Sequence, residues 1–411
     1  MQSLLEILIK HVLKELENLG MSKSTIKSYA YSAYSPIKSY FARNGTKYYE
    51  PRLLNAFLAS EQGRLKYHEI SERHFRKLRR AVLMLHDLHQ NGALRDSRYH
   101  LGSKYKASEY YYLYLQQFVE SQYLSKGTIS TIKSIILQFL CEMEHAGHCD
   151  FSTISPKDVK DFLLVAAGKN KGGMPNVLYA LRLFLDYLKS NSLVSKDFHP
   201  VLNTPVRRKK KVLPCFTREE VDSILKQIDI NTKQGKRDYA ILILASHTGL
   251  RSIDILNLRL SDIDWLNDSI HIVQKKTGRP LVLPLEMNTG NAIAEYILEA
   301  RPESTSEYVF LKTCAPYRKL ADCGTPNNIL AKYLKNSGIS HQPGDGKSFH
   351  ALRRSMGTWM LESGVPLTTI SQVLGHKDQD SAKQYLSMDH ERLKMCALGF
   401  QEIPVERGIF A

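Results

Sequence analysis

The stretch SFHALRRSMG places a histidine and an arginine three residues apart, at His350 and Arg353. Downstream, LGHKDQDSAKQYL contains His376 and, nine positions later, Tyr385. Residues i and i+3 are neighbours on a helix, so we expect His350 and Arg353 to share one face, with Arg354 directed elsewhere. Farther upstream, an arginine follows the turn HTGL and a lysine precedes Thr-Gly in QKKTG.

These residue types suit attack on a phosphodiester bond without a metal ion. In-line attack builds negative charge on the non-bridging oxygens, which the planar forks of Arg251 and Arg353 can bind. A tyrosine hydroxyl needs a base such as histidine to take its proton, and Lys276 can protonate the departing oxygen. Each residue alone also fits an ordinary surface, turn or packing role. Their order and spacing together favour a single site.

The set and its order resemble the tyrosine recombinases of the lambda-integrase class: Arg251, Lys276, His350, Arg353, His376 and Tyr385. HTGLRSIDILNLRL resembles the first arginine box of that family, and QKKTG its hairpin, in which the lysine directly before Thr-Gly is catalytic. HALRRS resembles the H-x-x-R box, and LGHKDQDSAKQY the box that ends at the nucleophile. One departure is Asp254, where the family often has glutamate. Its acidic side chain could still orient Arg251.

The resemblance implies a mechanism. Tyr385 attacks the scissile phosphate and forms a 3′-phosphotyrosyl link, which frees a 5′-hydroxyl. The two arginines bind the non-bridging oxygens, and Lys276 protonates the leaving oxygen. His350 assists the proton of the tyrosine, and His376 hydrogen-bonds the phosphate. No ATP or metal cofactor is required, because the link conserves the energy of the broken bond.

The resemblance also implies double-stranded DNA as the partner and a homotetramer on two duplexes. A tail helix after the tyrosine would dock on a neighbouring subunit, with packing on its own domain as the alternative. The extra N-terminal module favours an integrase or transposase of a mobile element, for which directionality or DNA-bending proteins can be accessory partners.

The composition agrees with a nucleic-acid partner. Of the 411 residues, 57 are Lys or Arg and 41 are Asp or Glu, a net charge of +16, and a protein this basic usually binds polyanions. The longest strongly apolar run, AILILA, is far too short to span a bilayer. No secretory signal is evident, and the six cysteines are scattered. We therefore expect reduced thiols, no membrane association and a cytoplasmic, nucleoid-associated protein.

Two N-terminal segments, residues 1–95 and 105–203, follow one helical plan. Each contains Ser-Lys-x-Thr-Ile, which predicts a hydroxyl-capped helix. We predict first an accessory, arm-type DNA-binding bundle, in which RHFRKLRR supplies five cations, with binding of a partner protein as the alternative. The second segment is predicted to be a core-binding bundle. Residues 204–216 form a basic linker that we expect to cross the DNA backbone, although a solvated linker is the alternative. Its consecutive cations are Arg207, Arg208, Lys209, Lys210 and Lys211.

The catalytic segment, residues 217–411, opens with the capping box Thr217-Arg-Glu-Glu220. A buried helix ending at Thr248-Gly249 and a hairpin centred on Thr277-Gly278 follow, and EYVFLK can add a strand. The predicted fold is mainly α with a small antiparallel β-sheet in the C-terminal domain. Two N-terminal helical bundles precede an α+β catalytic domain.

Other interpretations stay open at this stage. A nicking–closing enzyme like the type IB topoisomerases shares the chemistry but rejoins the same strand. A non-catalytic DNA-binding protein on this fold would not need all six residue types, and an RNA-binding protein explains only the charge.

Two local patterns favour ordinary packing. The tyrosines of YYYLYLQQF sit at helical spacing, which favours core packing over base stacking. CEMEHAGHC offers four zinc ligands, but its spacing matches no common finger, so a packed helix end is preferred. Those residues are Cys141, His145, His148 and Cys149.

Overall fold

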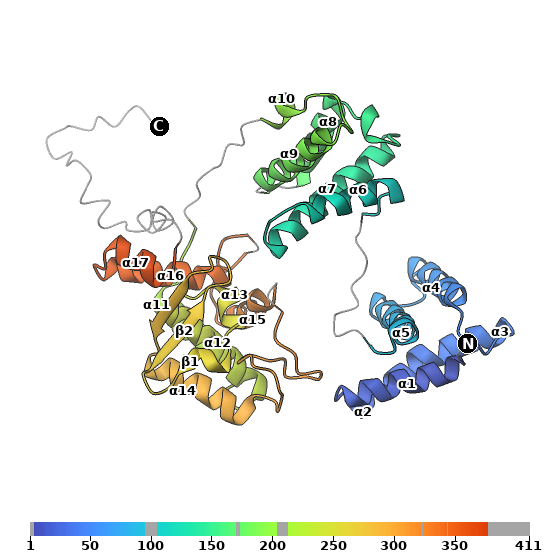
Figure 1. Cartoon of the computed structure of the whole chain (residues 1–411). Coiled ribbons are helices and arrows are strands. Elements are labelled where there is room, and N and C mark those ends of the chain that lie inside the picture. Colours follow the sequence, from blue (N-terminus) through green and yellow to red (C-terminus); the bar gives the residue numbers. More distant parts are fainter. Residues whose placement is uncertain are drawn as a thin grey trace, which may run out of the picture. The chain divides into compact units, whose positions relative to one another are not determined.

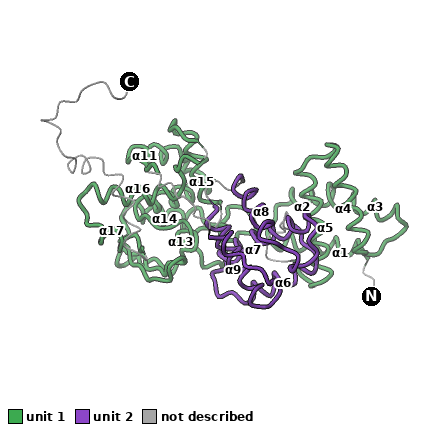
Figure 2. Tube along the Cα trace, turned by 90° about the horizontal axis from the view of Figure 1, so that it is seen from above, with its two compact units in different colours: residues 1–96, 211–411 green, residues 97–210 purple. Residues whose placement is uncertain are grey.

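The structure, a computed structural model, describes residues 4–94, 105–169, 173–203, 213–321, 324–342 and 344–376 (Figure 1). These residues group into two compact units, one drawn from residues 1–96 and 211–411 and the other from residues 97–210 (Figure 2). No helix in the described ranges has both the length and the apolar content that a bilayer span requires. The division into residues 1–95, 105–203 and 217–411 stays a prediction.

The first segment is helical, and serines cap two of its helices. Ser22 accepts a hydrogen bond from the amide of Thr25, as the Ser-Lys-x-Thr-Ile pattern predicts, and Ser71 accepts one from the amide of His74. The elements are α1 (Leu5–Asn18), α2 (Lys23–Tyr29), the π-helical turn η1 (Ala30–Tyr34), α3 (Ser35–Arg43), α4 (Pro51–Lys66) and α5 (Glu72–Asn91).

The second segment repeats this order of helices, as the sequence predicts. Ser125 caps α7 by accepting from the amide of Thr128. Tyr111 and Phe118 of α6 are completely buried, whereas Tyr110 and Tyr112 are exposed. The predicted core packing therefore holds for one face of the tyrosine run. The elements are α6 (Glu109–Glu120), α7 (Lys126–His145), the 3-10 turn η2 (Phe151–Thr153), α8 (Pro156–Lys169), α9 (Met174–Ser190) and α10 (His199–Leu202).

The third segment is built around one buried helix, α12. The apolar run from Ala240 to Ala245 is buried throughout, because α11, α13, α14, α16 and η4 all pack against this helix. The capping box of Thr217 and Glu220 forms at the start of α11 as predicted. The helices are α11 (Arg218–Leu225), α12 (Lys233–Thr248), α13 (Ser252–Leu256), α14 (Met287–Glu295), the π-turn η4 (Tyr296–Ala300), α15 (Thr325–Leu334), α16 (Phe349–Glu362) and α17 (Leu367–Val373).

A small antiparallel sheet of order β1-β2-β3 accompanies these helices. Its strands are β1 (Ile263–Asp264), which follows the 3-10 turn η3 (Leu260–Asp262), β2 (Ser269–Val273) and β3 (Pro280–Pro284). The predicted hairpin is confirmed, with Val273 opposite Pro280.

The stretch EYVFLK, expected as a further strand, forms only isolated bridges in the described chain, at Tyr308 and Leu311. Val309, Phe310 and Leu311 are all completely buried. Consecutive burial does not match the alternation of a half-buried strand, and this stretch fills the core instead.

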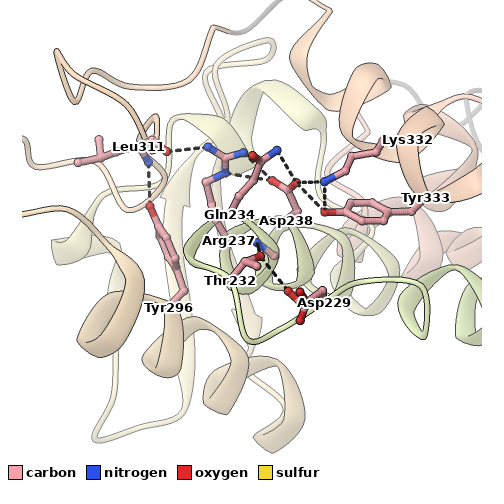
Figure 3. A network of polar contacts seen from close by, with 10 residues as sticks. Asp229, Thr232, Gln234, Arg237, Asp238, Tyr296, Leu311, Lys332 and Tyr333 are labelled. Atoms are coloured by element: carbon pink, nitrogen blue, oxygen red, sulfur yellow. Dashed lines mark hydrogen bonds and ion pairs between the residues drawn. The ribbon is translucent and has the colours of Figure 1, made fainter. Parts of the chain in front are cut away.

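A buried charged network joins α12 to α15 (Figure 3). Asp238 is completely buried and accepts hydrogen bonds from Arg237 Nη2 at 2.7 Å and Tyr333 Oη at 2.9 Å. Arg237 Nη1 donates to Leu311 O at 3.2 Å, and the Leu311 N–H donates to Tyr296 Oη at 3.1 Å. A buried charge is costly unless it is paired and hydrogen-bonded, so this network requires α15 and the chain around residue 311 to stay docked on α12.

We predict that Tyr333→Phe destabilises the catalytic segment, because it removes a hydroxyl bonded to the buried Asp238 carboxylate. Hydrogen bonds to charged groups contribute about 1.5–3 kcal/mol, and the free energy of unfolding should fall by about that amount. Both tryptophans of the chain, Trp265 and Trp359, lie in this segment, so their fluorescence in urea follows its unfolding. Tyr317→Phe alters an exposed ring and should change stability by less than about 0.5 kcal/mol. Equal losses in the two variants would contradict the role of the network.

Candidate active site

Arg251 follows a tight turn between two helices. α12 ends at Thr248, and Gly249 adopts a left-handed φ of 62°. A Cβ at that glycine would lie 2.7 Å from Leu374 Cδ2, so both the backbone conformation and the close contact require glycine. The turn places the half-buried Arg251 at the N-cap position of α13.

α16 directs its two neighbouring arginines to different sides. Arg353 is only 3% exposed. Its Nη1 donates to Gly249 O at 2.8 Å, and its Nη2 donates to Leu374 O. Arg354 points elsewhere, as the helical spacing predicts, and its Nη2 donates to Pro214 O at 3.1 Å. Only Arg353 therefore faces the HTG turn.

The two predicted phosphate-binding arginines meet at one turn of the chain. Arg251 Nη2 donates to Gly375 O at 3.1 Å, and Arg353 binds the preceding carbonyl, that of Leu374. Gly375 has a φ of 61°, and His376 follows directly. The structure therefore brings Arg251, Arg353 and His376 together from three distant parts of the sequence.

Lys276 lies in the turn of the β2–β3 hairpin, as the sequence predicts. The turn is closed by a hydrogen bond from Gln274 N to Arg279 O at 2.9 Å and by one from Gly278 N to Gln274 O at 2.8 Å. Lys276 is exposed, and its charge contributes to lowering the pKa of His350. The lysine thus belongs to the same electrostatic cluster as the histidines and arginines.

Asp254 connects the first arginine box to this hairpin. It is 4% exposed, and its Oδ1 accepts the Lys275 N–H at 2.8 Å. Burial raises the pKa of its carboxyl, while the Lys275 amide and the positive charges of Arg251, Arg353 and Lys275 oppose the rise. The aspartate that replaces the more frequent glutamate is therefore inside the cluster, where it positions the hairpin backbone.

Both histidines are neutral near pH 7. His350 retains exposed surface, yet loss of hydration around its ring lowers its pKa to about 4, helped by four basic neighbours led by Arg353. Desolvation is also the largest cause of the lowered pKa of His376, followed by the charges of Arg353 and Arg251, and this pKa is again about 4. A neutral imidazole can accept a proton, and the charge of a bound phosphate would make it a stronger base.

Several predicted site residues lie outside the described residues. They are the nucleophile Tyr385 and the linker cations Arg207, Arg208, Lys209, Lys210 and Lys211. Their roles stay predictions.

Two residues that the sequence analysis did not single out contact the site. Gln274 is completely buried and donates to Leu374 O at 3.3 Å. Arg279 Nη1 donates to His376 O at 3.1 Å. Both residues flank the Lys-Thr-Gly turn, and this position was the only hint of their role in the sequence. They were missed because polar residues beside a turn ordinarily face solvent.

Of the four side chains weighed as zinc ligands, only Cys141 is buried, and His145 is exposed. His148 Nδ1 bonds Thr153 Oγ1 at 2.9 Å, and its Nε2 lies 3.3 Å from Asp158 Oδ2. Cys141 is buried, whereas Cys149 is exposed. Within the described part of the chain, no three His, Cys, Asp or Glu side chains gather to hold a metal ion.

Known proteins share both the sequence and the fold of this segment. Residues 214–392 match the Phage integrase family. The y4rA protein of Sinorhizobium fredii, named as an integrase/recombinase, is 31% identical over 287 residues, 69% of this chain and 69% of that protein. The tyrosine recombinase XerD of Listeria monocytogenes is 26% identical over 292 residues, 68% of this chain and 94% of that protein.

A solved structure, a lambda integrase tetramer bound to a Holliday junction, has a similar fold. It covers 67% of this chain and 76% of its own, with a TM-score of 0.52 and 19% sequence identity. At that identity the likeness concerns the fold alone.

The third segment brings two arginines to one turn, and its relatives are integrases and tyrosine recombinases. The protein is therefore a tyrosine-type site-specific DNA recombinase. The chain belongs to the phage integrase family.

The two lowered histidine pKa values predict a pH-dependent stability. Both lie at about 4 in the folded chain, below the ordinary 6.5, so the unfolded chain binds more protons between these values. The contribution of the histidines to the free energy of unfolding should be full above pH 6.5 and decrease as the pH falls towards 4. Urea unfolding followed by tryptophan fluorescence, at about pH 7.5 and about pH 5, measures the decrease. His350→Asn and His376→Asn should each make this loss of unfolding free energy at low pH smaller. If the loss is unchanged in both variants, neither histidine has a lowered pKa in the folded chain.

Proposed function

We propose that this recombinase integrates or excises a mobile element by cutting and rejoining DNA through a 3′-phosphotyrosyl intermediate. The observation that carries the proposal is the convergence of Arg251 and Arg353 on the Leu374–Gly375 turn. Guanidinium groups remain charged at any accessible pH and match phosphate oxygens in pairs. A scissile phosphate at this turn would therefore meet two fixed positive charges beside two neutral histidines.

In the proposed step, Tyr385 Oη attacks the phosphorus, a Tyr385–phosphate bond forms, and the bond from phosphorus to the 5′ oxygen breaks. The proton of the phenol passes to His350, whose neutral imidazole can accept it. The 5′ oxygen takes a proton from the ammonium of Lys276 and leaves as a hydroxyl. Every proton thus has a donor and an acceptor within the cluster.

The arginines and the second histidine stabilise the charge that this step builds. Negative charge grows on the non-bridging oxygens, where Arg251 and Arg353 bind, and His376 hydrogen-bonds one of these oxygens. The phosphotyrosyl bond retains the energy of the phosphodiester. A 5′-hydroxyl of a second duplex can therefore reverse the step without ATP, and the reaction needs no metal ion.

Strand exchange between duplexes needs one site for each cut strand, which we propose is supplied by a homotetramer. The tetrameric assembly of lambda integrase on a Holliday junction supports this. We propose that the tail after Tyr385 docks on a neighbouring subunit. Directionality or DNA-bending proteins are proposed accessory partners.

The segments before the catalytic domain are proposed to bind the duplex. The linker cations of residues 207–211 would contact the DNA backbone, and the helical segment 105–203 would form the core-binding domain. In the first segment, Arg73 and Arg80 of α5 are exposed, as an accessory DNA-binding helix requires. This additional module is the feature that favours a mobile-element integrase or transposase acting on DNA in the cytoplasm.

The alternative is a nicking–closing enzyme that rejoins the strand it cut. The two functions differ in their products, because only recombination joins two separate sites. Relaxation of a supercoiled plasmid carrying two target sites, without any joined product, would favour the alternative.

The first test of the proposal is a covalent trap. A nicked duplex from the element's crossover site, identified by inverted repeats flanking the coding region, should yield a protein–DNA adduct in EDTA and without ATP. Tyr385→Phe should abolish the adduct because it removes the nucleophilic oxygen. The adduct is measured on denaturing gels. An equal yield from the variant would rule out Tyr385 as the nucleophile.

The second prediction concerns charge stabilisation by Arg251. Arg251→Ala should raise the barrier to cleavage by about 2.7–4 kcal/mol, the cost of removing one comparable oxyanion donor. The measurement is single-turnover cleavage with saturating protein. Arg259→Ala is the matched control, because this arginine pairs with Glu307 at an exposed position. A similar rate for both variants would contradict the role of Arg251.

A further inference from the structure

The hairpin turn that carries Lys276 is fastened by a buried glutamine. Gln274, which is completely buried, donates from Nε2 to Leu374 O at 3.3 Å. Its Oε1 accepts the hydroxyl proton of Thr277 at 2.7 Å. The amide of Gln274 therefore makes one hydrogen bond within the turn and a second one to the segment whose carbonyls bind the two arginines.

The carbonyl that Gln274 contacts is also the one that Arg353 binds. A carbonyl oxygen has two lone pairs and can accept both donors. The approach depends on Gly375, because a Cβ there would lie 2.3 to 2.6 Å from the three atoms of the Gln274 amide. The Gln274 amide thus packs directly against Gly375, where no side chain could be accommodated.

A second contact fastens the other side of the turn. Arg279 Nη1 donates to His376 O at 3.1 Å, and the backbone of Arg279 is bonded to that of Gln274. The residues between them, including Lys276, are therefore bracketed by two side chains that bind the segment Leu374 to His376.

We propose that Gln274 and Arg279 are positioning residues that hold Lys276 within reach of the leaving 5′ oxygen. The inference rests on the proposed function, in which Lys276 supplies the proton. Lys276 itself is exposed, so its flexible side chain is positioned mainly by the backbone of the turn, whose two ends are held by Gln274 and Arg279. Proton transfer requires hydrogen-bond distance, and a displacement of about 1 Å can cost about 10²-fold in rate.

The test compares two leaving groups in single-turnover cleavage by the full chain, with saturating protein. One crossover duplex has the natural bridging 5′ oxygen, and the other has sulfur at that atom. Sulfur leaves as a thiolate without a proton, because a thiol has a pKa of about 8.5. Lys276→Ala should slow cleavage of the oxygen substrate by about 10²–10⁴-fold and cleave the sulfur substrate at nearly the parent rate.

Gln274→Met and Arg279→Ala should follow the same pattern. Each should slow cleavage of the oxygen substrate by about 10-fold or more and recover to within about threefold of the parent on the sulfur substrate. In a chain that already carries Lys276→Ala, Gln274→Met should cause no further loss on either substrate. We expect the methionine variant to fold, because Arg353 still satisfies Leu374 O.

The controls separate the inference from the proposed function. Val282→Thr, at an exposed position of β3, should match the parent on both substrates. If Lys276→Ala recovers on sulfur while Gln274→Met and Arg279→Ala stay slow, the positioning role is wrong and the proton role of Lys276 stands. If Lys276→Ala itself fails to recover, its proposed role and the inference both fall.

Discussion

Two guanidinium groups on two consecutive backbone carbonyls form the interaction on which the catalytic segment depends. Arg353 binds Leu374 O and Arg251 binds Gly375 O. Carbonyl oxygens orient an arginine without cancelling its charge, whereas a carboxylate would neutralise it. The buried acid Asp254 accepts its hydrogen bond from the hairpin amide of Lys275. The two guanidinium groups therefore keep their positive charge at this turn.

Desolvation, reinforced by neighbouring positive charges, explains the neutral state of the two histidines. Loss of hydration lowers both imidazole pKa values to about 4, with repulsion by the neighbouring arginines as the smaller contribution. The DNA-free site is thus prepared with permanent charge on its arginines and with proton-accepting capacity on its histidines.

The sequence predicted those parts of the site that local spacing determines. His350 and Arg353 share a helix face, and Lys276 sits at a hairpin turn, because helix and strand periods are fixed by the backbone. The pairing of Arg251 with Gly375 O could not be predicted, since it joins residues far apart in the chain. Burial of Gln274 against Gly375 was missed for the same reason.

The fold outside the site was predicted to a similar extent. Repeated serine caps indicated the same order of helices in the two N-terminal segments, as found. The stretch EYVFLK, with its β-branched and aromatic residues, indicated a strand, but three successive buried residues serve the core instead. Local propensity cannot tell a strand from a buried irregular segment when the competing factor is tertiary packing.

The buried residues Arg354 and Ser355 of α16 fix where the chain enters the catalytic segment. Arg353 faces the Leu374–Gly375 turn. On the same helix, Arg354 Nη2 donates to Pro214 O, and Ser355 Oγ accepts the Phe216 N–H at 2.7 Å. The last residues of the linker segment are therefore anchored on the helix that carries His350 and Arg353. The linker thus enters the catalytic segment through hydrogen bonds to α16, two residues before α11 begins.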